Sequence, residues 1–123
     1  MKKIIIAEDD KFLNSAYRLK FTKDDFEVTI VNDGQQLLDI LKKYLPDLVL
    51  LDLVMPVMDG FSALKNIRSN PKLKSLPIIV ASNLGQKEDI DRAKDLGATD
   101  FVVKSDLSLD MLVTKINKLI SKK

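Results

Sequence analysis

A run of four apolar residues that ends on an acid constrains this chain more than any other feature. Residues 48–51 contain no polar side chain, and Asp52 follows them directly. A short apolar run of this kind predicts a strand that is buried on both faces, as in a parallel sheet. An ionised carboxylate at the tip of a buried strand is unfavourable unless a cation meets it there. The other candidates for a functional site are therefore the residues that the fold brings close to Asp52.

The rest of the chain alternates between short apolar runs and segments with helical periodicity. The other predicted strands are residues 4–7, 26–31, 78–81 and 101–103. A helix is expected after each strand, and there is no linker or low-complexity segment between the units. This alternation predicts one α/β domain over residues 1–123, with a doubly wound parallel sheet that is covered by helices on both faces.

The helical segments have recognisable start and stop signals. The spacing of apolar residues extends the first helix to about Phe21 and places Leu19 on its apolar face. Short polar side chains that can accept a backbone hydrogen bond precede several helices, and a glycine follows one of them. The expected caps are Asp10, Asn32 or Asp33, and Ser108, with Gly97 closing the fourth helix.

The composition excludes several classes of function. With no cysteine and no histidine, the chain lacks thiol chemistry, and a metal must be held by oxygen atoms, which favours Mg²⁺, Ca²⁺ or Mn²⁺. The 20 basic and 18 acidic residues leave a net charge of +2, and the lysines are scattered along the chain. We therefore expect a solvated surface and no direct nucleic-acid binding. The apolar runs are too short to cross a membrane, and we expect a cytoplasmic protein.

Polar residues follow several of the predicted strands, and the fold is expected to gather them. Right-handed crossovers place the carboxyl ends of all parallel strands at one edge of the sheet. The residues delivered there are Glu8, Asp9, Asp52, Ser82 and Lys104. Two carboxylates ~4 Å apart repel by on the order of 4 kcal/mol at an effective dielectric of about 20, so a cation is expected between them. A lysine, a hydroxyl and Mg²⁺ around one carboxylate are suited to phosphoryl transfer to an aspartate.

Four motifs in this chain resemble those of response-regulator receiver domains. They are Ala7-Glu8-Asp9-Asp10, residues 50–56 with Asp59-Gly60, residues 77–82, and Gly97-Ala98 with residues 101–104. The resemblance covers essentially the whole chain. It implies a flavodoxin-like (βα)5 fold with strand order 2-1-3-4-5, and Mg²⁺ as cofactor, for which Mn²⁺ can substitute.

The resemblance implies how the metal and the phosphoryl group are held. Asp52 would be the phospho-acceptor and a metal ligand. Asp9 would bind Mg²⁺ directly, Glu8 mainly through water, and Val54 through its backbone carbonyl. From the other side, Ser82 and Lys104 would contact the phosphoryl oxygens.

The resemblance also implies a switch that involves Phe101 and Ser82. After Lys104 the chain departs from the pattern of the family. Phe101 falls at the position of an aromatic residue that turns inward when the hydroxyl of the fourth strand, here Ser82, moves toward the phosphoryl group. Most receivers have proline after the lysine of the fifth strand, with a cis peptide bond. Here Ser105 follows Lys104, and we expect a trans bond because a cis bond before a residue other than proline costs about 3 kcal/mol.

The expected function is a signalling switch and not an enzyme with turnover. A histidine kinase or phosphotransfer protein would supply the phosphoryl group, and the surface of residues 86–121 would regulate an unknown partner. A hydrolase that uses an aspartate nucleophile in the haloacid-dehalogenase manner needs a second acid at the position of Val54. The alternative is a degenerate receiver that docks without being phosphorylated. The sequence leaves open whether the chain works alone or as one domain of a larger protein.

Overall fold

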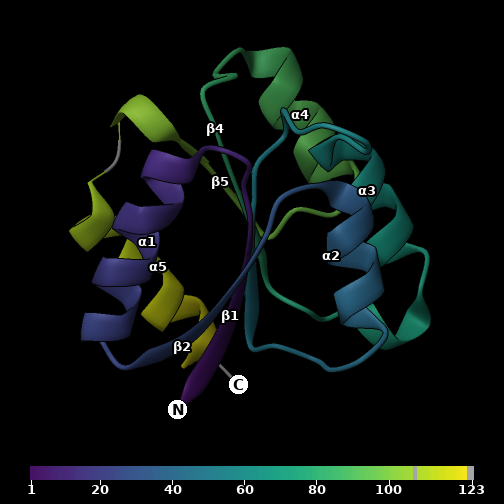
Figure 1. Cartoon of the computed structure of the whole chain (residues 1–123). Coiled ribbons are helices and arrows are strands. Elements are labelled where there is room, and N and C mark those ends of the chain that lie inside the picture. Colours follow the sequence, from purple (N-terminus) through teal and green to yellow (C-terminus); the bar gives the residue numbers. More distant parts are fainter. Residues whose placement is uncertain (107, 122–123) are drawn as a thin grey trace.

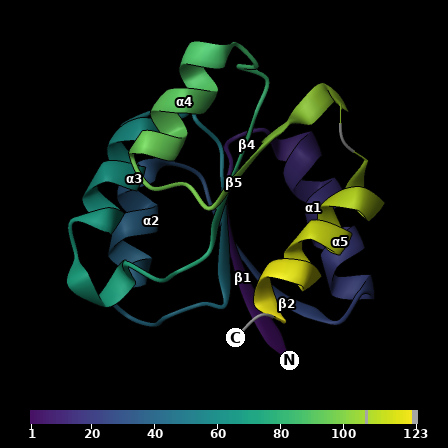
Figure 2. The same ribbon diagram turned by 180° about the vertical axis from the view of Figure 1, so that it is seen from behind.

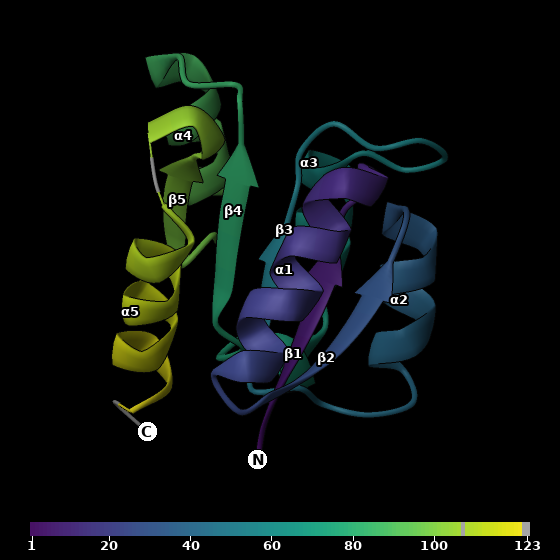
Figure 3. The same ribbon diagram turned by 60° about the vertical axis from the view of Figure 1, so that its left-hand side comes forward.

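Five parallel strands form a single sheet in the computed structural model, which describes residues 1–106 and 108–121. The strand order is β2-β1-β3-β4-β5, and every neighbouring pair is parallel. In Figure 3 the strand arrows all point toward the same end of the molecule. The strands are β1 (Lys2–Ala7), β2 (Phe26–Val31), β3 (Leu48–Leu51), β4 (Ile78–Ser82) and β5 (Asp100–Val103). The predicted fold class and strand order are confirmed.

Five α-helices and two 3₁₀ turns connect the strands and cover both faces of the sheet. Helices α1 and α5 lie on one face, and α2, α3 and α4 lie on the other (Figures 1 and 2). The helices are α1 (Lys11–Lys23), α2 (Gly34–Leu41), α3 (Gly60–Arg68), α4 (Lys87–Asp95) and α5 (Leu109–Ile120), and the 3₁₀ turns are η1 (Pro71–Leu73) and η2 (Lys104–Asp106).

The alternation of side chains along each strand divides the core into two halves. On β1, Ile4 and Ile6 face the half under α1 and α5, whereas Ile5 and Ala7 face the half under α2 and α3. Successive residues of a strand point to opposite faces, and both faces here are covered, so all four residues of β3 are buried. This double burial explains why the sequence of β3 is continuously apolar and fixes where Asp52 emerges.

Side-chain caps start most of the helices where the sequence predicts. The Oδ1 atom of Asp10 accepts hydrogen bonds from two backbone N–H groups of the first turn of α1. Asp33, and not Asn32, caps α2, and Ser108 caps α5. Gly97 follows α4 with a φ of +107°, a conformation in which a side chain would be strained.

The sequence prediction for α1 is wrong in two details. The helix continues to Lys23, two residues past the expected end at Phe21. Leu19 is 75% exposed and does not belong to the buried face, which is formed by Asn14, Tyr17 and Phe21. Those three residues recur at intervals of three and four, so the correct face includes a polar residue that an apolar pattern does not count. Over the residues that the structure describes, no helix has the length and apolar character needed to cross a membrane.

Candidate functional site

Three carboxylates meet at the carboxyl edge of the sheet, as expected. The backbone N–H of Asp52 donates to the carbonyl of Ala7 at 3.0 Å, which places the end of β3 beside the end of β1. One carboxylate oxygen from each of Glu8, Asp9 and Asp52 lies within 4.8 Å of the other two. Glu8 and Asp52 are buried, whereas Asp9 is exposed. The adjacent central positions of β1 and β3 in the sheet therefore bring these acids together.

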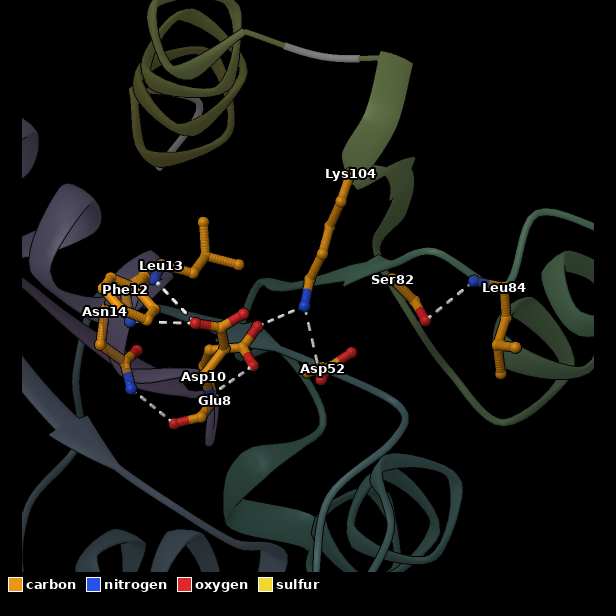
Figure 4. A network of polar contacts seen from close by, with 9 residues as sticks. All are labelled: Glu8, Asp10, Phe12, Leu13, Asn14, Asp52, Ser82, Leu84 and Lys104. Atoms are coloured by element: carbon orange, nitrogen blue, oxygen red, sulfur yellow. Dashed lines mark hydrogen bonds and ion pairs between the residues drawn. The ribbon is translucent and has the colours of Figure 1, made fainter.

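Lys104 reaches into this acidic cluster from the end of β5. Its Nζ atom forms an ion pair with Oε1 of Glu8 and lies 3.4 Å from Oδ2 of Asp52. Figure 4 shows the lysine side chain extending toward the two carboxylates. All three side chains are largely withdrawn from solvent, with exposures of 16% for Lys104, 3% for Glu8 and 8% for Asp52. The peptide bond from Lys104 to Ser105 is trans, as expected.

The buried acids are electrostatically unfavourable despite the lysine. Burial raises the pKa of the Glu8 carboxyl above its ordinary value, although hydrogen bonds from Lys104 and from the backbone of Asp10 act in the opposite direction. Burial likewise raises the pKa of Asp52, against the lowering effect of the Lys104 charge. One ammonium group therefore does not fully compensate for the desolvation of two carboxylates.

Ser82 and Phe101 lie on the neighbouring strands β4 and β5. Ser82 is the last residue of β4 and is buried, and its Oγ atom accepts a hydrogen bond from the backbone N–H of Leu84 at 3.2 Å (Figure 4). Phe101 is half-buried and packs against the half of the core under α2, α3 and α4. In this structure the oxygen of Ser82 is thus an acceptor within its own turn.

Asn14 is a site residue that the sequence reasoning missed. Its Nδ2 atom donates to the backbone carbonyl of Glu8 at 2.7 Å, and the side chain is buried. The backbone N–H of Asp10 donates to Oε2 of Glu8 at 3.1 Å, so α1 holds the Glu8 backbone and the N-cap residue of this helix holds the Glu8 side chain (Figure 4). The available signal was a polar residue three positions before Tyr17 on the buried face of an amphipathic helix.

The loop between β3 and α3 passes the site and is held at two points. Gly60 donates from its backbone N–H to the carbonyl of Leu53 at 2.9 Å, and Gly34 donates to the carbonyl of Met58 at 3.1 Å. Val54, the predicted carbonyl ligand, lies in this loop two residues after Asp52, and its side chain is 61% exposed. The loop is therefore tied to the start of α2 on one side and closed onto the start of α3 on the other.

Val57 occupies a strained conformation at the tip of this loop. Its φ is +66°, and the N–H of Met58 donates to the carbonyl of Pro56 at 2.7 Å, which makes a γ-turn of the rare hand with Val57 at its centre. A β-branched residue in the left-handed region costs roughly 1–2 kcal/mol. The side chain is 82% exposed, so no packing contact compensates for this cost.

Replacing Val57 with glycine is expected to stabilise the protein. The relief of left-handed strain exceeds the extra flexibility that glycine brings to the unfolded chain, for a net gain of about 0.5–1 kcal/mol. Urea unfolding of V57G measures the gain. Asp25 has a φ of +68° and provides the matched control. Because aspartate tolerates this region better, D25G should change stability less, and an equal gain in both variants would contradict the strain at Val57.

The donor set of the cluster suits a hard divalent cation. It consists of carboxylate oxygens, and the whole sequence contains no histidine and no cysteine. Mg²⁺, Ca²⁺ and Mn²⁺ prefer such ligands, and Mg²⁺ is commonly held by only one or two carboxylates with water completing its shell. Two buried acids whose charge is incompletely balanced by Lys104 also favour a bound cation.

The family model for the response regulator receiver domain matches residues 4–117. The chain belongs to this family. The match includes most of β1, all of β2 to β5 and the first three quarters of α5, so receiver-domain membership agrees with the fold and with the position of the acidic cluster. Receiver domains are the phospho-acceptor modules of two-component systems, and histidine kinases phosphorylate them to control downstream effectors.

Two curated relatives show the range of proteins that contain such a domain. The chain is 34% identical to the chemotaxis protein CheY of Bacillus subtilis, over 97% of this chain and 98% of CheY. It is 37% identical to a protein-glutamate methylesterase/protein-glutamine glutaminase of Syntrophomonas wolfei, over 98% of this chain but only 35% of that protein. The chain thus spans only 22–35% of the length of three of the curated relatives that it matches.

Solved structures agree with the fold. The receiver domain of the Francisella response regulator 1452 is 28% identical, covers 99% of this chain and 98% of that one, and superposes with a TM-score of 0.91. The Mn²⁺-bound form of the response regulator Rcp1 is also 28% identical, covers 98% of this chain and 93% of that one, and has a TM-score of 0.80. A receiver domain of this similarity is therefore known to bind a divalent cation.

Proposed function

We propose that this receiver domain is a phosphorylation-driven switch whose phospho-acceptor is Asp52. The observation that supports this best is that Asp52 emerges from a fully buried strand into contact with Lys104, beside Glu8 and Asp9. A solvent-exposed carboxylate would not need a charged partner of this kind. An ion pair alone would not require three carboxylates, whose mutual repulsion is a cost to folding.

The proposed reaction transfers a phosphoryl group from a phosphohistidine of a histidine kinase or phosphotransfer protein. An oxygen of Asp52 attacks phosphorus, and the phosphorus–nitrogen bond of the donor breaks as the new phosphorus–oxygen bond forms. The imidazole released by the donor takes a proton from solvent. Lys104 lies 3.4 Å from Asp52, close enough for its ammonium group to offset the negative charge of the phosphoryl oxygens.

A magnesium ion completes the proposed site. Asp9, Asp52 and the backbone carbonyl of Val54 would hold it, with Glu8 acting mainly through water, and Mn²⁺ would substitute for it. When bound, the ion supplies the positive charge that neutralises the phosphoryl oxygens. Glu8 is already paired with Lys104, which is consistent with its less direct role.

We propose that the readout involves Ser82 and Phe101. The Oγ atom of Ser82 accepts from Leu84, so its own proton is available for donation to a phosphoryl oxygen. A shift of Ser82 toward Asp52 would free space for Phe101, which is half-buried. The changed surface would be that of α4, β5 and α5, by which the domain would regulate a downstream protein. We propose that residues 1–123 form a single receiver domain that acts in the cytoplasm. We propose also that this domain makes no direct contact with nucleic acid or membrane.

Intact mass measurement tests the proposal directly. The protein is incubated with Mg²⁺ and a small phosphodonor such as acetyl phosphate, and the expected result is the gain of one phosphoryl group. The variant D52N should gain none. The variant D59N is the matched control, because Asp59 caps α3 in the same loop and asparagine can also cap a helix.

The alternative function is a docking module that does not depend on phosphorylation. It predicts no mass gain in the wild-type protein with Mg²⁺ present, and that result would overturn the proposal. Retention of the gain in D52N would instead show that another side chain is the acceptor. A gain in both the wild type and D59N, with none in D52N, is the pattern that the proposal requires.

A further inference from the structure

Three lysines from two separate segments of the chain line one groove on the face of the molecule that carries α2 and α3. The groove consists of two adjoining hollows of about 250 and 420 Å³, between the end of α2 with the residues after it and η1. Leu41, Lys42, Asn70 and Leu73 line both hollows, so the hollows lie next to each other. Figure 2 shows α2, α3 and the turn that follows α3 side by side at this end of the molecule. We call this feature the α2–η1 groove.

The floor of the α2–η1 groove is apolar and its rim is basic. Leu38, Leu41 and Leu73 form this apolar floor, and Leu45 lies at its edge with 60% exposure. The basic residues are Lys42, Lys43 and Lys72. Within the described part of the chain, none of these lysines forms an ion pair, and no acidic side chain lines either hollow.

The nearest acids along the chain are already engaged. Asp39 accepts a hydrogen bond from Nε2 of Gln35 at 3.0 Å, and Asp47 accepts one from the backbone N–H of Lys3 at 2.7 Å. Neither acid lines the groove or forms an ion pair with its lysines, so the positive charge of the rim is not balanced by an acid of the groove itself.

Both walls of the groove are fixed by hydrogen bonds. On one side, the hydroxyl of Tyr44 donates to Oγ1 of Thr29 at 3.1 Å and anchors the residues after α2 to β2. On the other side, Nη1 of Arg68 donates to the carbonyl of Leu73 at 2.7 Å, and Oδ1 of Asn70 accepts from the N–H of Lys72 at 3.0 Å. A preformed groove binds a ligand without the entropic cost of ordering its own walls.

We propose that the α2–η1 groove is a docking site for an acidic peptide segment of a partner protein, with a leucine-type side chain in the groove and carboxylates at the lysines. The apolar floor distinguishes this ligand from nucleic acid, which places phosphates and not hydrocarbon against a basic surface. A second copy of the chain is also a poor match. A two-fold contact through the groove would bring its basic rim against the same basic rim of the second copy.

The location makes this docking independent of phosphorylation. The groove lies at the end of α2, near where β3 begins, whereas Asp52 lies where β3 ends. A partner in the groove would leave the acidic cluster accessible. The inference therefore does not rest on the function proposed for Asp52, and the two can fail separately.

Titration with a defined peptide tests the proposal. The probe is a short, terminally blocked peptide of aspartate and glutamate with two leucines on one helical face, and binding is followed by amide ¹⁵N–¹H shifts. The matched peptide has asparagine and glutamine in place of the acids. We expect saturable shifts in residues 38–45 and in Asn70, Lys72 and Leu73 with the acidic peptide, and affinity at least about tenfold lower for the uncharged one.

Paired variants identify the groove as the site. K42E/K72E and L45D should each lower the affinity about tenfold. K87E/K94E reverses two exposed lysines on α4 and should bind as the wild type does, and so should D52N. Shifts outside the groove, equal binding of the uncharged peptide, or equal loss in K87E/K94E would overturn the proposal. So would tighter binding of a single-stranded oligonucleotide at the same residues, or dimerisation of the wild type that K42E/K72E abolishes.

Discussion

Replacing Gly60 with alanine is expected to destabilise the protein by at least about 3 kcal/mol. A Cβ atom at this position would lie 2.2 Å from the carbonyl oxygen of Asp52 and 2.7 Å from Cα of Leu53. Both neighbours are backbone atoms at the end of the central strand β3, so neither can move away as a flexible side chain would. The N–H of Gly60 also donates to Leu53, which holds the two segments together and prevents the loop from relaxing outward.

Urea unfolding of G60A measures this effect, and G85A is its control. A Cβ atom on Gly85 would meet only the Val103 side chain, at 3.3 Å. Because a side chain can adjust by a few tenths of an ångström, G85A should stay within about 0.5 kcal/mol of the wild type. Similar stabilities for G60A and G85A would show that the end of β3 can move away from α3. In that case the position of Asp52 would be less fixed than the structure indicates.

Replacing Lys104 with methionine is expected to cost about 3 kcal/mol at neutral pH in the presence of a chelator. The substitution leaves Glu8 and Asp52 buried next to each other without a cation. The comparison is K115M, which breaks the pair of Lys115 with Asp100. Those two side chains are 41% and 34% exposed, so the loss there should stay below about 1 kcal/mol. Urea unfolding of both variants measures the difference, and equal losses would contradict it.

The penalty in K104M should decrease as the pH falls. Burial raises the folded-state pKa of Glu8 and Asp52 above their ordinary values of 4.5 and 3.8. Protonation of these carboxyls therefore stabilises the folded state. This contribution is complete below the ordinary values and is lost as the pH rises through the raised ones. Protonated acids do not need Lys104, so K104M should approach the wild type in acid, and a constant difference across the pH range would contradict this explanation.

Sequence reasoning placed the candidate residues at one edge of the sheet but did not determine which of them pair. The positions of Glu8, Asp9, Asp52 and Lys104 follow from the topology, because each comes directly after a strand of a parallel sheet. The pairing of Lys104 with both Glu8 and Asp52 depends on side-chain reach, which spacing along the chain does not determine. The hydrogen bond that Ser82 accepts from Leu84 was likewise not predictable, since a hydroxyl can donate or accept.

The details that were missed share a physical cause: they depend on how the elements pack against one another, which the spacing of residues along the chain does not determine. Leu19 has helical spacing, but no element covers its side of α1. Asn14 has the wrong polarity for a core position, but the carbonyl of Glu8 is its partner. Lys42 and Lys72 are scattered in the sequence, and only the packing of η1 beside the end of α2 brings them to one groove.

The order of the strands separates the candidate site into two parts with different local stability. The acids are attached to β1 and β3, which each have a strand on both sides, whereas Lys104 follows β5, which pairs with β4 alone over four residues. Backbone groups of an edge strand open to solvent at lower free energy than those of central strands. Amides of β5 should therefore exchange with deuterium sooner than those of β1 and β3. The lysine can thus leave the carboxylates through a local opening of β5, while the acids stay in place on the inner strands β1 and β3.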